Sequence, residues 1–160
     1  MNEGVEWGLH CCLTLTWLDQ EQAVPSAKLA TLFGLSPTYL NKCLQRLTKA
    51  GLLTSTSGPH GGVRLARAPE DITLMDVVAA VEGRETAFRC SEIRQQGVSG
   101  ADTSPREFAQ PCGIATAMRR AELAWRRELA GQTIADLIAS APPGSARRVR
   151  RSYDRLGAPA

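Results

Sequence analysis

Residues 26–51 read SAKLATLFGLSPTYLNKCLQRLTKAG, and this stretch decides the fold. Ser26 is a good N-cap for a short helix, and a tight turn follows at Gly34. Ser36 then caps a second helix with Pro37 at its first position, where the missing N–H costs nothing. Two short helices joined by a tight turn are the signature of a helix-turn-helix.

The second of these helices is amphipathic and is followed by a hairpin. Its apolar face is formed by Leu40, Cys43, Leu44 and Leu47, and Gly51 ends it. The next stretch, LLTSTSGPHGGVRLA, predicts one strand over 52–55, a glycine-rich turn over 58–62 and a return strand over 63–66. Two helices followed by a hairpin predict a winged helix-turn-helix domain.

The flanking segments complete the prediction of a mainly α fold with a small β wing. A first helix is expected over 3–19, and a helix capped by Asp71 or Thr73 ends the DNA-binding domain, residues 1–82. Residues 83–111 form a long polar loop, a length that is usually functional or disordered. A long helix and a short helix capped by Thr133 follow over 112–140, and the Pro-, Gly- and Arg-rich tail 141–160 is expected to be disordered.

The long helix favours a homodimer. Its apolar residues alternate by four, three and four, as in a coiled-coil seam: Ile114, Met118, Ala121 and Trp125. An intramolecular core face is the alternative.

Composition and charge favour a nucleic-acid partner. The 160 residues carry a net charge of only +3. Residues 22–69, however, contain six basic residues and no Asp or Glu. The positive field of this stretch favours a polyanionic partner. We expect a cytoplasmic protein, because no long apolar run and no signal-peptide start are present. The sequence shows no phosphate loop, catalytic triad or paired acid–base carboxylates, so an enzyme with a small-molecule substrate is not expected.

The predicted contacts with double-stranded DNA lie on the second helix and on the wing. The start of a recognition helix meets base edges in the major groove, and a basic or polar wing tip enters the minor groove. The predicted recognition-helix residues are Ser36, Pro37, Thr38, Tyr39 and Lys42, with Arg46 meeting phosphate. The predicted wing residues are His60, Gly61, Gly62 and Arg64. The arginines of the tail, Arg147, Arg148, Arg150 and Arg151, are candidates for non-specific phosphate contacts.

The five cysteines fall into different settings. Cys43 lies on the apolar helix face, and the adjacent Cys11 and Cys12 are expected to be buried small hydrophobes. Cys90 and Cys112 instead lie at the two ends of the long loop, where they could bind a metal or form a disulfide. Two thiolates are too few for a tetrahedral metal or an iron–sulfur centre.

The first helix offers two further metal ligands. Glu6 and His10 lie one turn apart in the stretch VEWGLHCC, residues 5–12, and can reach one metal ion together. A surface carboxylate–imidazole pair without a metal is the other interpretation.

Several motifs together resemble the Rrf2 family of dimeric bacterial regulators, whose members include IscR and NsrR. They are the SPTYL opening of the recognition helix, the GPHGGVRL wing, the DITLMDVV helix and the cysteine-bearing loop before a long helix. The resemblance spans about residues 3–138. Family members commonly bind an iron–sulfur cluster through three cysteines of this loop, whereas this chain has two.

The details resemble the RsrR-type branch of redox regulators, in which VEWxLHCC opens the first helix and the loop reads CxEIRQ. That resemblance implies a 2Fe-2S cluster held by Cys90 and Cys112 of one subunit and by Glu6 and His10 of the other. It implies a redox-sensing transcription factor, and Trp7, next to Glu6, is a candidate relay to the DNA-binding helices. Two alternatives stay open: a cluster-free switch in which Cys90 and Cys112 form a disulfide or bind zinc, and a DNA-binding or scaffold relative without a sensor.

Overall fold

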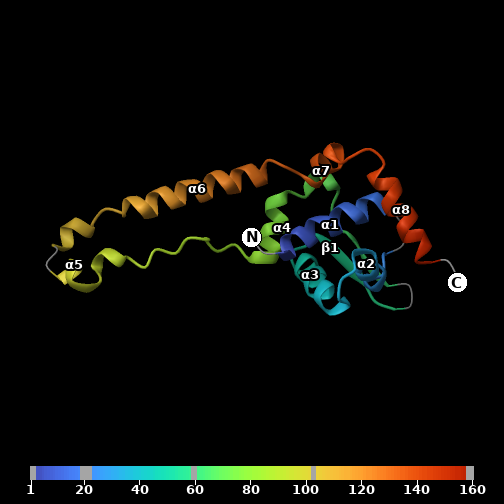
Figure 1. The fold of residues 1–160 in the computed structure, drawn as a ribbon, viewed down its shortest axis with the longest axis horizontal. Helices are drawn as coiled ribbons and strands as arrows, with labels where there is room; N and C mark the ends of the chain where they lie inside the picture. Colours follow the sequence, from blue (N-terminus) through green and yellow to red (C-terminus); the bar gives the residue numbers. More distant parts are fainter. Residues whose placement is uncertain (1–2, 19–22, 59–60, 102–103, 158–160) are drawn as a thin grey trace. The chain divides into compact units, whose positions relative to one another are not determined.

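A computed structural model describes residues 3–18, 23–58, 61–101 and 104–157. Within these ranges the chain is mainly helical with one two-stranded antiparallel sheet (Figure 1), as the sequence predicts. It divides into two compact units, residues 1–84 with 129–160, and residues 85–128. No helix among the described residues is long and apolar enough to cross a membrane.

The first unit contains a helix-turn-helix packed on the N-terminal helix. Helix α1 (Glu3–Leu18) packs against α3 (Pro37–Lys49) and α4 (Leu74–Glu82), and α2 (Ser26–Phe33) packs against α3. The predicted apolar face of α3 is buried throughout: Leu40, Cys43, Leu44 and Leu47.

The helices begin and end near the residues predicted from the sequence, except that the N-cap of α2 differs by one residue. Gly34 ends α2 in the left-handed conformation, at a φ of 66°, which suits a residue without a Cβ. Ser36 is the N-cap of α3 and Pro37 its first residue, as predicted, whereas the N-cap of α2 is Pro25 and Ser26 is already helical. Thr73 caps α4 by a capping box with Asp76.

The wing is an antiparallel hairpin of β1 (Leu53–Thr56) and β2 (Gly62–Leu65), paired from Leu53 with Leu65 to Thr56 with Gly62. It is joined to the chain before α2 by an isolated bridge between Val24 and Val63, with both N–H···O distances at 2.9 Å. A short turn, η1 (Pro69–Asp71), leads from the wing to α4.

The chain returns to the first unit after the second. Helix α7 (Ile134–Ser140) begins at Thr133, which caps it as predicted and bridges to Thr73. Within the tail that was predicted to be disordered, residues 145–155 form a helix, α8 (Ser145–Arg155), that packs on α1 and α2. Its order depends on tertiary burial of Tyr153, which composition does not reveal.

The second unit contains the loop and most of the long helix. The loop holds three short helical segments, η2 (Ile93–Gln95), α5 (Gly97–Ala101) and η3 (Pro105–Phe108). The long helix, α6 (Gly113–Ala130), leaves its predicted seam accessible in the single chain, with Ile114 69% and Met118 43% exposed.

Candidate functional site

The start of α3 presents the residues predicted to face DNA. Ser36, Pro37, Thr38, Tyr39 and Lys42 are all exposed, while the leucines of the same helix are buried. The helix therefore offers hydroxyl groups and an ammonium on the side that does not pack on α1.

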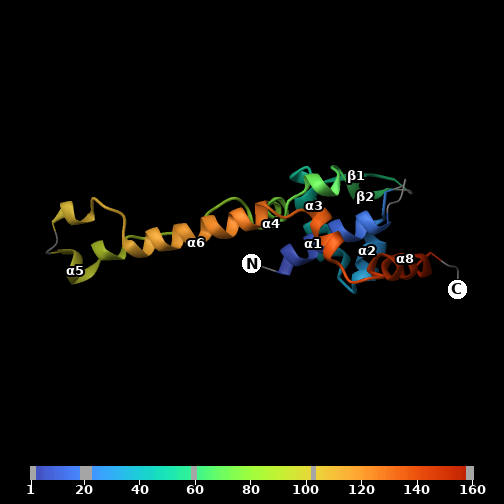
Figure 2. The same cartoon turned by 90° about the horizontal axis from the view of Figure 1, so that it is seen from above.

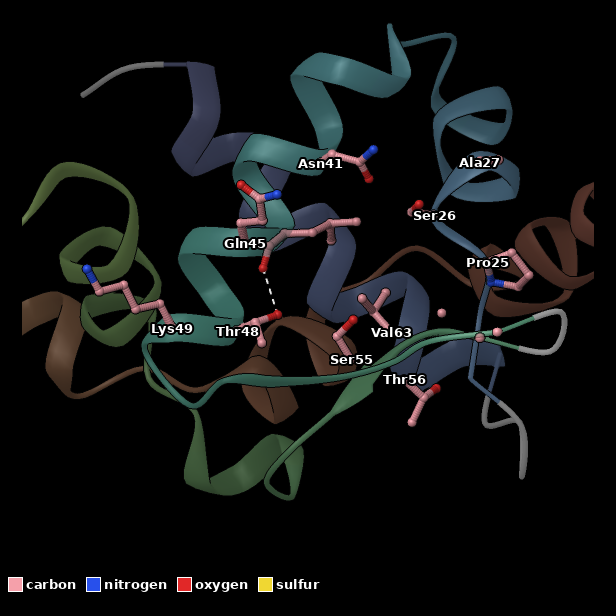
Figure 3. Close-up of a pocket in the computed structure, with 14 residues that line it drawn as sticks. Pro25, Ser26, Ala27, Asn41, Gln45, Thr48, Lys49, Ser55, Thr56 and Val63 are labelled. Carbon is pink, nitrogen blue, oxygen red and sulfur yellow. Dashed lines mark hydrogen bonds between the residues drawn. The ribbon is translucent and has the colours of Figure 1, made fainter.

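A groove of about 800 Å³ lies between α3 and the wing (Figure 3). Asn41 and Gln45 line it from α3, and Ser55 and Thr56 line it from the wing. These neutral donors and acceptors can bond base edges or backbone oxygens. Asn41 and Gln45 were not predicted from the sequence as DNA contacts. Their spacing of four residues on the polar face of the recognition helix could have indicated them.

The wing contributes to the same groove through its glycines. Gly61 and Gly62 line it, and Arg64 is exposed on β2. A Cβ at Gly62 would lie 2.3 Å from the carbonyl oxygen of Val24, so this glycine also permits the bridge that holds the wing. The predicted contact of His60 lies outside the described residues.

Arg46 has a structural partner that the sequence did not indicate. Its guanidinium donates to the carbonyl oxygen of Val81, at 3.0 Å, near the C-terminus of α4. Arg46 thus ties the recognition helix to α4, and its contact with phosphate stays a prediction.

In the second unit, Cys90 and Cys112 line one cavity of about 460 Å³. Cys90 is exposed, Cys112 is half-buried, and both are free thiols. Cysteines from opposite ends of the loop are therefore brought to one place, as their positions in the sequence suggested.

The surroundings of this cavity favour a thiolate. The backbone N–H groups of Ala115 and Ile114, at the start of α6, donate to the Cys112 sulfur and lower its pKa. Burial opposes this shift, and the guanidinium of Arg94 lowers the same pKa while the Glu92 carboxylate, paired with Arg94, raises it.

Arg94 is held in place by three contacts. It donates to Glu92 at 2.5 Å and to the carbonyl oxygen of Gln110 at 3.2 Å, and it lies 5.5 Å from the centroid of the Phe108 ring. A fixed cation therefore faces both cysteines of the cavity.

Glu6 and His10 lie on an exposed face of α1, in the first unit. Trp7, between them in sequence, contacts the ring of His10 with centroids 6.0 Å apart and that of Phe33, in α2, at 5.5 Å. Among the residues with described positions, no three or more His, Cys, Asp or Glu side chains of one chain group into a metal site. The structure thus pairs Cys90 with Cys112 and places Glu6 one turn from His10, with the two pairs in different units.

The remaining cysteines are core residues, as predicted. Cys11 and Cys12 are fully buried, and burial raises the pKa of Cys12 to about 12. Cys43 is buried with its sulfur 3.5 Å from the carbonyl oxygen of Gly4. None of these thiols offers a reactive thiolate at neutral pH.

Comparison with known proteins identifies the family. The sequence profile of the Rrf2 family, described as an iron-dependent transcriptional regulator, matches residues 1–140. Protein rrf2 of Nitratidesulfovibrio vulgaris is 36% identical over 135 residues, 84% of each chain. The HTH-type transcriptional regulator NsrR of Geobacillus kaustophilus is 30% identical over 133 residues, 83% of this chain and 85% of that one.

The solved structure of CymR, the global cysteine regulator of B. subtilis, has the same fold. It matches with a TM-score of 0.65 at 23% identity, covering 89% of this chain and 98% of that one. Because the family profile covers most of the chain and the helix-turn-helix and wing are both present, the chain belongs to the Rrf2 family of DNA-binding transcriptional regulators, a family of regulators and not of enzymes.

Proposed function

We propose that this protein is a homodimeric, cytoplasmic redox sensor of the RsrR type, which controls transcription through a 2Fe-2S cluster. Cys90 and Cys112 of one subunit and Glu6 and His10 of the other would hold the cluster. The observation that supports this most directly is the shared cavity of Cys90 and Cys112, because it places two accessible thiols together beside a fixed cation.

The donor set fits such a cluster. Two thiolates serve one iron, and an imidazole with a carboxylate one turn away can serve the other. Among the described residues of one chain, no group of three or more His, Cys, Asp or Glu side chains could hold a metal ion, so a second subunit is the natural source of the other pair. The exposed positions of Glu6 and His10 leave both side chains available to a partner.

The cluster would supply a reversible one-electron change of charge at the dimer interface. Arg94 then offsets the negative charge of the thiolates, and the backbone N–H groups of Ile114 and Ala115 hold the Cys112 sulfur in place. On α1, Trp7 contacts both His10 and Phe33, so a displacement of His10 reaches the helix-turn-helix directly. We infer that this contact is the route from sensor to DNA-binding helices.

The first test is the visible absorption spectrum of anaerobically purified protein, with iron and sulfide content, before and after dithionite. We expect visible bands that bleach on reduction, with about two irons and two sulfides per cluster. The variants Cys90→Ser, Cys112→Ser and the double variant Glu6→Ala/His10→Ala should lose these bands. Cys12→Ala and Glu107→Ala, which remove a core thiol and an exposed carboxylate elsewhere, should keep them.

Mixed dimers test whether the ligands come from two subunits. Glu6→Ala/His10→Ala protein and Cys90→Ser/Cys112→Ser protein are each expected to be colourless. After unfolding and refolding together in equal amounts, with reconstitution, they should recover about a quarter of the wild-type cluster content, since half the dimers are mixed and one of two sites in each is complete. No recovery would refute ligation across the interface.

A colourless, iron-free wild-type protein after reconstitution would refute the cluster altogether. In that case a Cys90–Cys112 disulfide or a bound zinc ion, detected by mass spectrometry, would identify the thiol-based alternative.

A further inference from the structure

Helix α8 presents a row of arginines on one side. Arg147, Arg148, Arg151 and Arg155 line a shallow hollow of about 380 Å³, and all four are exposed. The helix has one carboxylate, Asp154, and within the described part of the chain none of these arginines forms an ion pair with an acidic residue. The row is therefore positive charge without internal compensation.

The opposite side of α8 is used for packing (Figure 2). Tyr153 is 6% exposed, and Lys28, in α2, lies over its ring at 5.1 Å from the centroid. Arg150 donates to the carbonyl oxygen of Trp17, in α1, at 2.5 Å. These contacts fix the orientation of the helix, so the arginines point away from α1 and α2.

This packing also favours nucleic acid over a lipid surface as partner. A basic helix that binds a bilayer inserts its apolar face among the acyl chains. In α8 that face is occupied by α1 and α2, and only the cationic side is free to bind.

Helix α2 links the DNA-facing groove to α8. Ser26 and Ala27, at the start of α2, line the groove, and the next residue, Lys28, packs on Tyr153. Gly157, just after α8, also lies close to Lys28. The same helix, α2, therefore lines the groove at its start and holds α8 in place.

We propose that α8 is a second DNA-contacting element, whose arginines bind backbone phosphates beside the duplex segment read by α3 and the wing. This inference rests on the DNA-binding function. A guanidinium matches phosphate oxygens in a bidentate arrangement, and DNA presents a phosphate charge about every 1.7 Å along its axis. The contact adds affinity without base preference, because phosphates are the same in every sequence.

The test compares two double variants with the same loss of charge. Arg147→Gln/Arg151→Gln removes two of the four arginines of the row, and Arg119→Gln/Arg120→Gln removes two exposed arginines of α6. Binding is measured by fluorescence anisotropy between 50 and 300 mM salt, on an operator selected from a randomised duplex pool and on a random 40-base-pair duplex. Over about this range of salt concentration, counterion release makes the affinity for DNA depend strongly on salt.

We expect the α8 variant to reduce the slope of log affinity against log salt by about two per chain, since each phosphate contact contributes about 0.9. The loss should be the same factor on operator and random DNA. The control should keep the wild-type slope, and Arg147→Lys/Arg151→Lys should recover most of it. Thermal unfolding shows whether each variant is folded.

A wild-type slope in a folded Arg147→Gln/Arg151→Gln protein would overturn the role of α8 and leave the recognition helix and wing untouched. The role of α8 in DNA binding would also be overturned if wild-type protein binds phosphatidylglycerol vesicles and the α8 variant loses that binding alone. Failure of the wild-type protein to bind any duplex would instead remove the DNA-binding function, and with it this inference.

Discussion

Trp7 of α1 packs against Phe33 of α2, with ring centroids 5.5 Å apart, and also contacts the ring of His10, at 6.0 Å. One side chain therefore contacts both a proposed cluster ligand and the first helix of the helix-turn-helix. We propose that a change at His10 reaches the DNA-binding helices through this one side chain.

Replacement of Trp7 by alanine should uncouple sensing from DNA binding. We expect the ratio of operator affinities of oxidised and reduced protein to fall towards one, because the contacts through which Trp7 links His10 to Phe33 are lost. Anisotropy titrations of both redox states measure this ratio, and the visible spectrum shows that the cluster is retained. Trp7→Phe keeps an aromatic contact and should keep most of the ratio; an unchanged ratio in Trp7→Ala would exclude Trp7 as the relay.

Substitution of Met118 by aspartate should dissociate the proposed dimer. Met118 lies on the apolar seam of α6 and is 43% exposed in the single chain, so a partner would cover it. A buried unpaired charge costs roughly 3 kcal/mol, which raises the dimer dissociation constant on the order of 100-fold. Analytical ultracentrifugation over a concentration series measures the constant.

Leu123→Asp is the matched control for that change. Leu123 is also exposed, at 53%, and its position in the heptad is opposite the seam. The two variants make the same kind of substitution on the same helix, so equal weakening by both would argue against a seam at Met118.

Replacement of Gly62 by alanine should loosen the wing. The new Cβ would lie 2.3 Å from the Val24 carbonyl oxygen, so the bridge between Val24 and Val63 has to shift. We expect the free energy of unfolding to fall by roughly 1–3 kcal/mol and operator affinity to fall with it. Urea unfolding and anisotropy measure the two effects.

Ser57→Ala, at an exposed position of the same hairpin, should change neither quantity. If Gly62→Ala retained full stability and affinity, the close approach to Val24 would not be what holds the wing in position.

The elements built from local signals were predictable from the sequence. Pro37 at the first position of α3 and the capping box of Thr73 in α4 involve only neighbouring residues, and the leucines of α3 reveal its buried face by spacing alone. The pairing of Cys90 with Cys112 in one cavity was also expected, because both flank one loop.

What the sequence did not reveal depends on contacts between distant residues. The order of α8 comes from burial of Tyr153 beneath Lys28, which a composition rich in Pro, Gly and Arg conceals. The tie from Arg46 to Val81 joins two helices and has no local signature. Gln45 belongs to the groove because the wing lies opposite it, and only the tertiary structure shows that.

The bridge between Thr73 and Thr133 has a consequence for the length of the chain segment that it encloses. The bridge joins the two ends of the chain segment that leaves the first unit and returns to it. The Leu74 N–H donates to the Gln132 carbonyl oxygen and the Ile134 N–H to the Ile72 carbonyl oxygen, each at 2.9 Å. The entropy of closing such a segment grows only logarithmically, so doubling its length costs about 0.6 kcal/mol. Residues 85–128 can therefore be exchanged for a segment of another length while the first unit keeps its closure and nearly all of its stability.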